Sequence, residues 1–325
     1  MIISRTKYEA TENEISRLFE ENGMGKVIST GPLGDGEFNA ALKVVCEDGK
    51  DYVLKIAPPE NATVLSYEKN MMDSEVYWYR MMKDNTDISC PDIYAADFSG
   101  KIIKSSCFIM QMMPGAPLWK CNFFKDEAER VQAEKIGMLT KIHRIKNDRY
   151  GYRQLGLHDS WYKALHSMAE QLVKDCKNIG YETPDGEEFL KLIDKNEDIL
   201  NKASCRMVNF DLWDSNVLYD NGRLIWIDPE RGFWGDPVAD FITIGPGQKA
   251  PLSDKKNEIE IYNRTAKEKI ELCRDTEIRY ACAVAYLALI EEVEKYVRYE
   301  PDHPNYIRNT VDARDMYDMA FEIMR

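Results

Sequence analysis

One segment carries the most structural information in this chain: Asn209-Phe-Asp-Leu-Trp-Asp-Ser-Asn-Val-Leu-Tyr-Asp-Asn-Gly-Arg-Leu-Ile-Trp-Ile-Asp-Pro-Glu230. It contains two β-rich runs joined by Asp220-Asn221-Gly222, a sequence that is typical of a tight hairpin turn. A hairpin of that length folds back on itself, so its two open ends meet. We therefore expect Asn216 and Asp228, which flank the hairpin, to lie side by side.

The residues around this hairpin have the side chains that phosphoryl transfer requires. Asn216 and Asp228 suit Mg²⁺, which prefers oxygen ligands and keeps waters and phosphate oxygens for its remaining positions. Asp211 lies on the loop just before the hairpin and can face a substrate hydroxyl. The spacing D-x-x-x-x-N, followed by a later Asp, is that of the base and the two metal ligands of kinases. The segment therefore predicts a phosphotransferase.

The composition argues against several other classes of protein. The 325 residues suffice for one large domain or two lobes. The 43 basic and 56 acidic residues disfavour a nucleic-acid partner, because phosphate backbones attract an excess of Lys and Arg. The net charge of −13 could favour cationic substrates, but solubility explains it equally well.

Cysteine usage and hydropathy bear on the compartment. The eight cysteines form no C-x-x-C pair and no cluster with histidine, which favours reduced, mostly packed thiols. The longest apolar run, 281–290, is too short to cross a bilayer, and the N-terminus shows no signal peptide. We expect a cytoplasmic protein without membrane association.

The chain divides into a strand-rich part and a helical part. A capping box, Thr11 to Glu14, begins a first helix. The residues up to 113 then show strand patterns at 26–30, 39–46, 51–57, 93–97 and 107–112, and one helix at 66–82. After Pro114-Gly115 the pattern is mainly helical, at 127–145, 160–178, 187–202, 255–272, 275–299 and 308–324. We predict an α+β fold with an N-terminal nucleotide-binding lobe (1–113), a C-terminal catalytic and substrate-binding lobe (114–325), and a ligand between them.

The N-terminal part offers candidates for a nucleotide site. Gly34 and Gly36 lie between two predicted strands, where their backbone amides could meet phosphate oxygens, although an ordinary hairpin turn is the alternative. Lys55 lies on the third strand, in the place of a lysine that contacts the α- and β-phosphates. Its apolar neighbours favour this role over that of a solvent-facing lysine. Met112 precedes the connection between the lobes, where an adenine edge would bind, although methionines are also common in cores.

A phosphate-binding lysine needs a carboxylate from the next helix to hold it. Glu68 and Glu75 both lie on the predicted helix 66–82, seven residues apart and hence on one face. We favour Glu75, because it precedes an apolar stretch that should pack inward, and we keep Glu68 as the alternative.

Together these residues resemble the aminoglycoside phosphotransferase and choline-kinase-like group of small-molecule kinases, relatives of the protein kinases. The similarity is carried by Asp211-Leu-Trp-Asp-Ser-Asn216, by Ile227-Asp228-Pro-Glu230 and by Gly235-Asp236-Pro-Val-Ala-Asp240. It extends from about residue 25 to about residue 294. The resemblance implies a two-lobed, protein-kinase-like fold with an antiparallel N-terminal sheet, and it implies transfer of phosphate from ATP or GTP to a hydroxyl of a small molecule.

The resemblance also implies roles for single residues. Asp211 would be the catalytic base, Asn216 and Asp228 would bind Mg²⁺, and Glu230 would be a supporting acid near the metal. Asp236 and Asp240 are expected to brace the catalytic loop, since aspartates in turns commonly bond backbone amides.

One departure from the group lies directly before the catalytic acid. The group usually has His-Gly there, and this chain has Asn209-Phe210. Asn also donates and accepts hydrogen bonds, so it could do part of the work of His, with the reaction rate in question. A pseudokinase that only binds nucleotide is one alternative. A protein kinase is less favoured, because no Ala-Pro-Glu follows Asp228. A housekeeping sugar or amino-alcohol kinase fits the same residues as a resistance enzyme.

Overall fold

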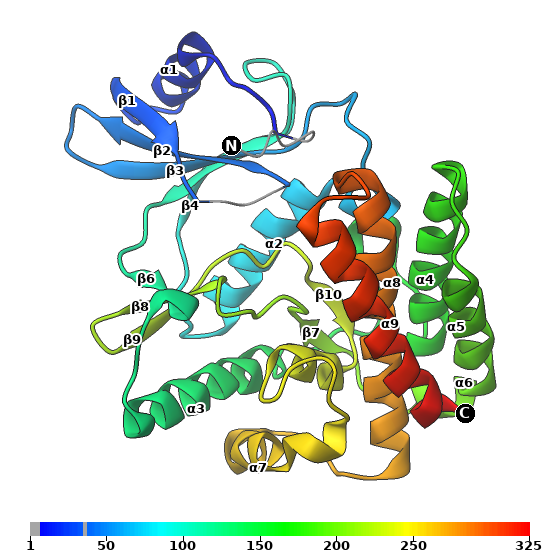
Figure 1. Cartoon of the computed structure of the whole chain (residues 1–325). Coiled ribbons are helices and arrows are strands. Elements are labelled where there is room, and N and C mark those ends of the chain that lie inside the picture. Colours follow the sequence, from blue (N-terminus) through cyan, green and yellow to red (C-terminus); the bar gives the residue numbers. More distant parts are fainter. Residues whose placement is uncertain (1–6, 35–37) are drawn as a thin grey trace.

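The computed structural model describes residues 7–34 and 38–325 and contains an N-terminal sheet beside a larger helical part (Figure 1). The strands are β1 Val27–Pro32, β2 Ala40–Cys46, β3 Asp51–Ile56, β4 Ile93–Asp97, β5 Cys107–Gln111, β6 Ala116–Pro117, β7 Arg206–Val208, β8 Val217–Asp220, β9 Arg223–Trp226 and β10 Phe233–Gly235. The helices are α1 Glu12–Glu21, α2 Met71–Asn85, α3 Lys125–Ile142, α4 Trp161–Asn178, α5 Pro184–Lys195, α6 Glu197–Leu200, α7 Lys256–Thr265, α8 Arg274–Arg298 and α9 Pro304–Met324. Among the short 3₁₀ segments, η1 (Ser66–Glu68) and η4 (Pro237–Thr243) matter for the site.

The N-terminal sheet is antiparallel throughout, with the strand order β1-β2-β3-β5-β4. Side chains alternate across β3, as the period of a strand requires. Tyr52, Leu54 and Ile56 pack in a cluster with the apolar face of α1. Val53 packs in the other, larger core with α2 and the helical part. Lys55 shares the face of Val53 and is therefore directed toward α2.

Helix α1 begins as its sequence predicts. The Thr11 hydroxyl accepts a hydrogen bond from the Glu14 amide, and the Glu14 carboxylate accepts one from the Thr11 amide. This capping box satisfies two amides that a helix start would otherwise leave without partners. Helix α1 thereby covers one face of the sheet and leaves the opposite face to the site.

The hairpin that flanks the predicted metal ligands is present. β8 and β9 pair antiparallel, and Asn221 and Gly222 both have positive φ (47° and 91°), as a tight hairpin turn requires. β6 adds a third strand to this sheet immediately after Gly115. Gly115 has a φ of 99°, and a Cβ built there would lie 2.5 Å from the carbonyl oxygen of Tyr219. Glycine is therefore required where the chain leaves the N-terminal sheet and meets the hairpin.

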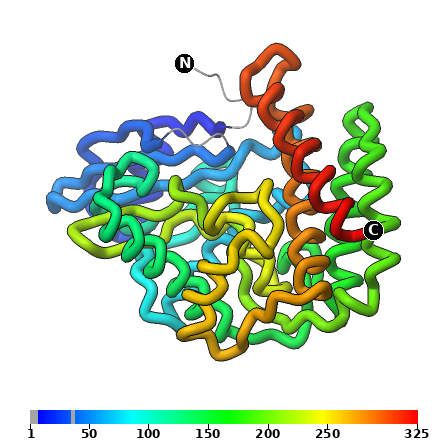
Figure 2. Tube along the Cα trace, turned by 60° about the horizontal axis from the view of Figure 1, so that its bottom comes forward, coloured from blue at the N-terminus to red at the C-terminus, as the bar shows by residue number. Residues whose placement is uncertain are grey.

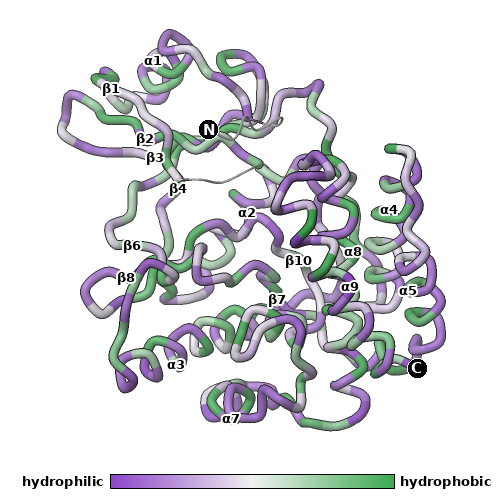
Figure 3. The backbone as a smooth tube through the Cα atoms, viewed as in Figure 1, coloured by the Kyte–Doolittle hydropathy of each residue, from purple (hydrophilic) through white to green (hydrophobic). Residues whose placement is uncertain are grey.

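The helical part is organised around α8. This long helix packs against α9 and α4, and α5 lies beside α4 (Figures 1 and 2). Residues 280–290 of α8 are all buried. The helices nearer the surface mix hydrophilic and hydrophobic positions along their length (Figure 3). The α+β class and the kinase-like arrangement expected from the sequence are thus confirmed.

Several predicted boundaries are wrong for identifiable reasons. The helix predicted over 66–82 begins at Met71, because Asn70 takes a left-handed conformation (φ 59°) that interrupts it. The helix predicted over 187–202 is two helices separated at Asn196. The helix predicted over 255–272 ends at Thr265. The short strands β7 and β10 were not predicted, because three residues are too few to show a period.

The expectations about membrane association and about the cysteines can be compared with the structure. Within 7–34 and 38–325, no helix is long and apolar enough to cross a membrane. All eight cysteines are unpaired and six of them are buried, in agreement with packed thiols.

Candidate active site

Lys55 and Glu75 form a buried ion pair. The lysine Nζ donates to both carboxylate oxygens of Glu75, at 2.8 and 2.9 Å. Lys55 is 5% exposed and Glu75 is fully buried, so water does not screen this pair. The strand period of β3 and the inner face of α2 bring the two residues together.

The same lysine reaches the carboxylate that follows the hairpin. Its Nζ lies 2.7 Å from an oxygen of Asp228 and 3.8 Å from one of Glu230. Burial alone would lower the pKa of Lys55, but the carboxylates of Asp228, Glu75 and Glu230 outweigh it and raise the pKa well above its usual range. Lys55 is therefore a permanent cation among three acids.

The backbone conformation of Asp228 directs its side chain toward Lys55, Glu75 and Glu230. Its φ is 60°, a left-handed conformation that costs on the order of 1 kcal/mol in a residue other than glycine. Its amide donates to the Tyr79 hydroxyl at 2.8 Å, which ties the strained residue to α2. Oxygens of Glu75, Asp228 and Glu230 lie within 4.8 Å of one another, close enough for one metal ion to reach them.

Glu68, the alternative partner of Lys55, lies elsewhere. It precedes α2, where its carboxylate accepts a hydrogen bond from the Leu65 amide (2.7 Å) and pairs with Arg298. The choice of Glu75 for the contact with Lys55 is therefore correct, and Glu68 belongs to a different ion cluster.

Asp211 and Asn216 are in direct contact. The Asn216 Nδ2 donates to the Asp211 side chain at 2.7 Å and to its carbonyl at 2.9 Å. The Asn216 Oδ1 accepts a hydrogen bond from the Ser215 hydroxyl at 3.3 Å. With Nδ2 held by Asp211, the amide presents an oxygen, the atom type that Mg²⁺ requires, on its other side.

The environment of Asp211 changes its acidity. Burial raises the pKa of Asp211 to about 7, and the carboxylates of Asp228 and Glu294 add to this effect. The guanidinium of Arg231 opposes it, with Nε 3.8 Å from an Asp211 oxygen. A carboxyl with a pKa near neutrality is a suitable general base.

Asp240 braces the loop that carries Asp211. Its two carboxylate oxygens accept hydrogen bonds from the amides of Asn209 (3.1 Å) and Phe210 (2.6 Å). The His143 Nε2 lies 2.9 Å from Oδ2 of the same carboxylate and helps to fix its position. The Asn209 Oδ1 in turn accepts from the Asp211 amide at 2.8 Å. Asn209 therefore supports Asp211, the predicted catalytic acid, by hydrogen bonding.

Phe210 occupies the position where the resemblance noted from the sequence leads us to expect glycine. Its φ is 63°, in the region that glycine adopts without strain. Its ring is buried between Phe233 and Tyr286, with centroids 5.3 and 5.8 Å away. Aromatic burial offsets the backbone strain.

Among the described residues, Asp236 makes no hydrogen bond or ion pair with the Asp211 loop and instead stabilises η4, the segment that contains Asp240. Its side chain accepts a hydrogen bond from the Val238 amide at the start of η4 and pairs with Arg279 at 3.1 Å. Asp240 lies within η4, so Asp236 fixes the segment that presents Asp240.

Two of the remaining predicted nucleotide contacts, Gly34 and Met112, lie within the described residues. Gly34 follows β1 and has a φ of 72°, which glycine adopts readily. Gly36 lies outside the described residues. Met112 directly follows β5 and is half-buried. Their contacts with nucleotide stay predictions.

The acidic face of α8 is not a solvated surface. Glu292 is buried and bonded to Thr183 (2.7 Å) and Tyr317 (3.1 Å). Glu294 is buried and pairs with Arg231 at 2.9 Å. These carboxylates meet cations and hydroxyls of the chain itself.

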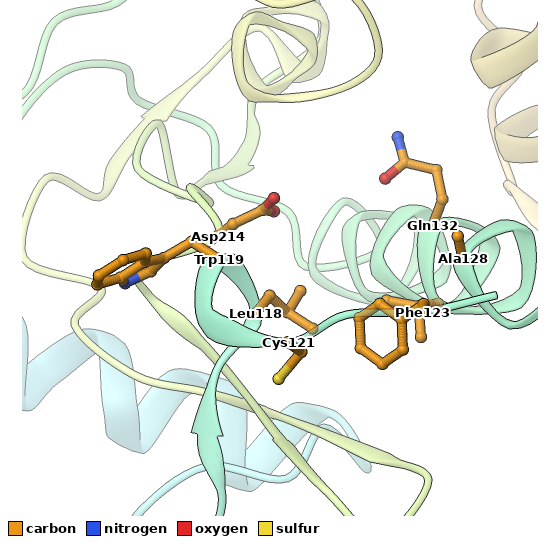
Figure 4. A pocket seen from close by; sticks show the side chains of 8 residues that line it. Leu118, Trp119, Cys121, Phe123, Ala128, Gln132 and Asp214 are labelled. Carbon is orange, nitrogen blue, oxygen red and sulfur yellow. The ribbon is translucent and has the colours of Figure 1, made fainter. Parts of the chain in front are cut away.

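A pocket of about 340 Å³ adjoins the catalytic loop at Asp214 (Figure 4). Besides Asp214 it is lined by Leu118, Trp119, Cys121, Phe123, Ala128, Val131 and Gln132. The buried Lys135 holds the Asp214 carboxylate at 2.8 Å. Gln132 is a further polar side chain of the lining, so a ligand there would meet polar groups as well as apolar and aromatic side chains.

Sequence reasoning missed several residues of the site. Asn39 donates to Glu230 at 2.9 Å, and Arg231 lies beside Asp211. Arg231 directly follows Glu230, so a lone cation within an acidic segment was the available signal. No local pattern marks Asn39, because its partner is 191 residues away.

Comparisons with known proteins bear on the family and the fold. Residues 30–245 match the sequence model of a family described as the phosphotransferase enzyme family. No curated protein matches the chain in sequence. Solved structures resemble it over nearly their whole length. A candidate aminoglycoside phosphotransferase from Ralstonia eutropha has a TM-score of 0.67 at 17% identity, covering 97% of this chain and 98% of that one.

Two further structures show the breadth of the resemblance. A candidate fructosamine-3-kinase from Haemophilus somnus has a TM-score of 0.65 at 15% identity, covering 93% of this chain and 96% of that one. A variant of the aminoglycoside phosphotransferase APH(4)-Ia, in a ternary complex with AMP-PNP and hygromycin B, has a TM-score of 0.62 at 16% identity and covers 97% and 98%. At these identities the structural matches establish the fold.

Proposed function

The chain belongs to the phosphotransferase enzyme family, and we propose that it transfers the γ-phosphate of ATP or GTP to a hydroxyl group of a small molecule. The observation that carries this proposal is a pair of side-chain clusters at the open end of the β8–β9 hairpin, where the Ile227 amide donates to the Asn216 carbonyl at 3.0 Å. Asp211 is bonded to Asn216 at 2.7 Å, and Lys55 joins Glu75 to Asp228 at 2.8 and 2.7 Å. Base, amide, metal carboxylate and phosphate lysine are the parts that phosphoryl transfer uses.

In this proposal each side chain has a distinct task. Lys55 contacts the phosphates and is kept in place by Glu75. Asp211 orients the acceptor hydroxyl and takes its proton, a task that suits its raised pKa. Asp240 keeps the loop rigid by holding two consecutive amides. Positioning and charge neutralisation account for most of the catalysis in such reactions.

The donor atoms fit Mg²⁺. Asp228 and Glu230 offer carboxylate oxygens and Asn216 offers an amide oxygen, which are the ligands that this hard cation prefers. Asp228 would be the principal ligand, with a side chain that is 36% exposed and so accessible to a hydrated ion. When bound, Mg²⁺ neutralises the phosphate oxygens as charge develops on them.

The structural relatives suggest which acceptors to test. One is named as binding hygromycin B and another as a candidate fructosamine-3-kinase. For this chain we propose a hydroxylated amine or sugar, either an aminoglycoside or a metabolite such as an amino sugar, a ketoamine or an amino alcohol. Fold similarity does not select among them.

The proposal is tested by ADP release from Mg·ATP and Mg·GTP across a panel of such acceptors, with Asp211→Asn as control. We expect one acceptor class to stimulate release, and Asp211→Asn to lower kcat by about 10²–10⁴ while nucleotide affinity stays within about threefold. The control keeps the size of the side chain and its contact with Asn216. Full turnover in Asp211→Asn would contradict the role of the base. Mg·nucleotide binding without turnover for any acceptor would favour the pseudokinase alternative.

A further inference from the structure

A buried ion cluster connects the catalytic loop with the N-terminal part of the molecule. Starting from Asp211, charges alternate through Arg231, Glu294, Arg298 and Glu68. The Arg231–Glu294 distance is 2.9 Å, and Glu294 lies 3.3 Å from Arg298. The Arg298 and Glu68 side chains are also in contact. We name these five residues the ion chain.

The ion chain is shielded from water. Side-chain exposure is 17% for Arg231, 14% for Arg298, 8% for Glu294 and 2% for Glu68. Partly buried charges are screened little, so a change at one end is transmitted to neighbouring pairs more strongly than on a surface.

The far end of the ion chain lies directly before the helix that carries Glu75. Glu68 belongs to η1, three residues before α2 begins at Met71. Neighbouring contacts fix the same segment on the helical part. The Ser66 amide and hydroxyl donate to Asp175 of α4 at 2.6 and 2.7 Å, and the Tyr67 hydroxyl donates to Glu294. The position of α2, and with it the Lys55–Glu75 contact, therefore depends on α8.

Arg298 also contacts the segment that follows the glycine-rich loop. Its guanidinium lies over the Phe38 ring, 5.2 Å from the centroid. Phe38 is adjacent to Asn39, which bonds Glu230 in the metal cluster. One arginine on α8 thus touches the two N-terminal segments, around 38 and around 68, that border the site.

We propose that Arg298 and Glu68 are positioning residues for the transfer reaction. They act through Glu294 and Arg231 on the orientation of Asp211, and through η1 on the helix that presents Glu75. The inference rests on the proposed function, because it assigns a role in that reaction. The competing explanation is an ion pair that contributes only to stability.

The two explanations differ in what substitutions do to turnover. We expect Arg298→Met and Glu68→Gln each to lower kcat by about tenfold or more, because small misplacements of reacting groups are costly. Within 7–34 and 38–325, no hydrogen bond or ion pair joins either residue to Lys55, Gly34 or Met112, so the Kd for Mg·ATP should change by less than about threefold. Arg298→Lys keeps the charge and should recover most of the lost rate.

Mg·ATP hydrolysis, with water in the place of the acceptor, makes the test independent of the acceptor's identity. Lys249→Met is the matched control, since Lys249 joins a loop to α9 through Asp312 and Asp315, both at 2.7 Å, and in the described part of the molecule it forms no ion pair with the ion chain. All variants are assayed well below their unfolding transitions, with Kd measured by titration calorimetry.

Several outcomes would overturn the inference. These are wild-type kcat in Arg298→Met, a loss of rate in Lys249→Met as large as in Arg298→Met, and no recovery in Arg298→Lys. A wild-type chain that fails to bind Mg·ATP would overturn the proposed function and this inference with it. Hydrolysis that is lost in Asp211→Asn but unchanged in Arg298→Met would overturn the inference alone.

Discussion

Replacement of Lys55 by methionine is a demanding test of the buried ion cluster. Methionine keeps an unbranched side chain that is one atom shorter, and it removes the charge. Glu75, which is fully buried and has both oxygens bonded to the Lys55 Nζ, then loses its counter-charge. Removing one member of a buried ion pair typically costs about 3–5 kcal/mol, and we expect Lys55→Met to lower the free energy of unfolding by that amount.

The double variant separates lost pairing from lost packing. In Lys55→Met/Glu75→Gln the fully buried carboxylate is replaced by a neutral amide, while Asp228 and Glu230 still lack their cation. Part of the loss should therefore be recovered, to within about 1–2 kcal/mol of wild type. Lys83→Met is the control, because the Lys83–Asp92 pair is about half exposed (48% and 50%) and should contribute less than about 1 kcal/mol. Chemical denaturation followed by tryptophan fluorescence measures all four proteins.

The cost of Lys55→Met should also depend on pH in a defined direction. Burial raises the pKa of Glu75, and removing the lysine raises it further. A carboxyl with a folded pKa above its unfolded value destabilises the fold increasingly as pH rises through that interval. The deficit should therefore be smaller near about pH 5 than near about pH 8. A variant within about 1 kcal/mol of wild type at both values would refute the reasoning.

Three further predictions concern the metal, the connection between the two parts and the base. Asp228→Ala should weaken Mg·ATP binding by at least about tenfold in calorimetry, because it removes the principal proposed ligand, and unchanged affinity would contradict the metal assignment. Gly115→Ala should lower the free energy of unfolding by about 1–3 kcal/mol, since its Cβ would lie 2.5 Å from the Tyr219 carbonyl oxygen. A variant as stable as wild type would show that the hairpin can shift away from residue 115 without cost. At low Mg²⁺, kcat/KM should fall as pH decreases through about 7, because Asp211 becomes protonated. Raising Mg²⁺ should move this fall to lower pH. A fall near about pH 4 that does not depend on Mg²⁺ would contradict the raised pKa of Asp211.

Features that depend on short stretches of sequence could be predicted. The turn Asp220-Asn221-Gly222 determines the β8–β9 hairpin locally, so the approach of Asn216 and Asp228 to its open end follows without knowledge of the rest of the fold. The pairing of Lys55 with Glu75 follows from a strand of period two facing the inner side of the next helix.

Features that depend on distant partners could not be predicted. Glu294 and Arg231 are 63 residues apart, so no local pattern in the sequence indicates that they pair. The break between α5 and α6 has a similar origin. Asn196 bonds the Leu192 carbonyl within α5 and the Met324 carbonyl at the end of α9, a contact that exists only after the helices have packed.

The most direct test of the central claim is to identify the product by phosphorus NMR. Wild-type protein is incubated with Mg·ATP and an acceptor that stimulates ADP release, beside Asp211→Asn under the same conditions. We predict that a phosphate monoester of the acceptor appears at the rate of ADP formation and is nearly absent with Asp211→Asn. Equal monoester formation by both proteins, or inorganic phosphate as the product with every acceptor, would contradict transfer to a small-molecule hydroxyl by this site.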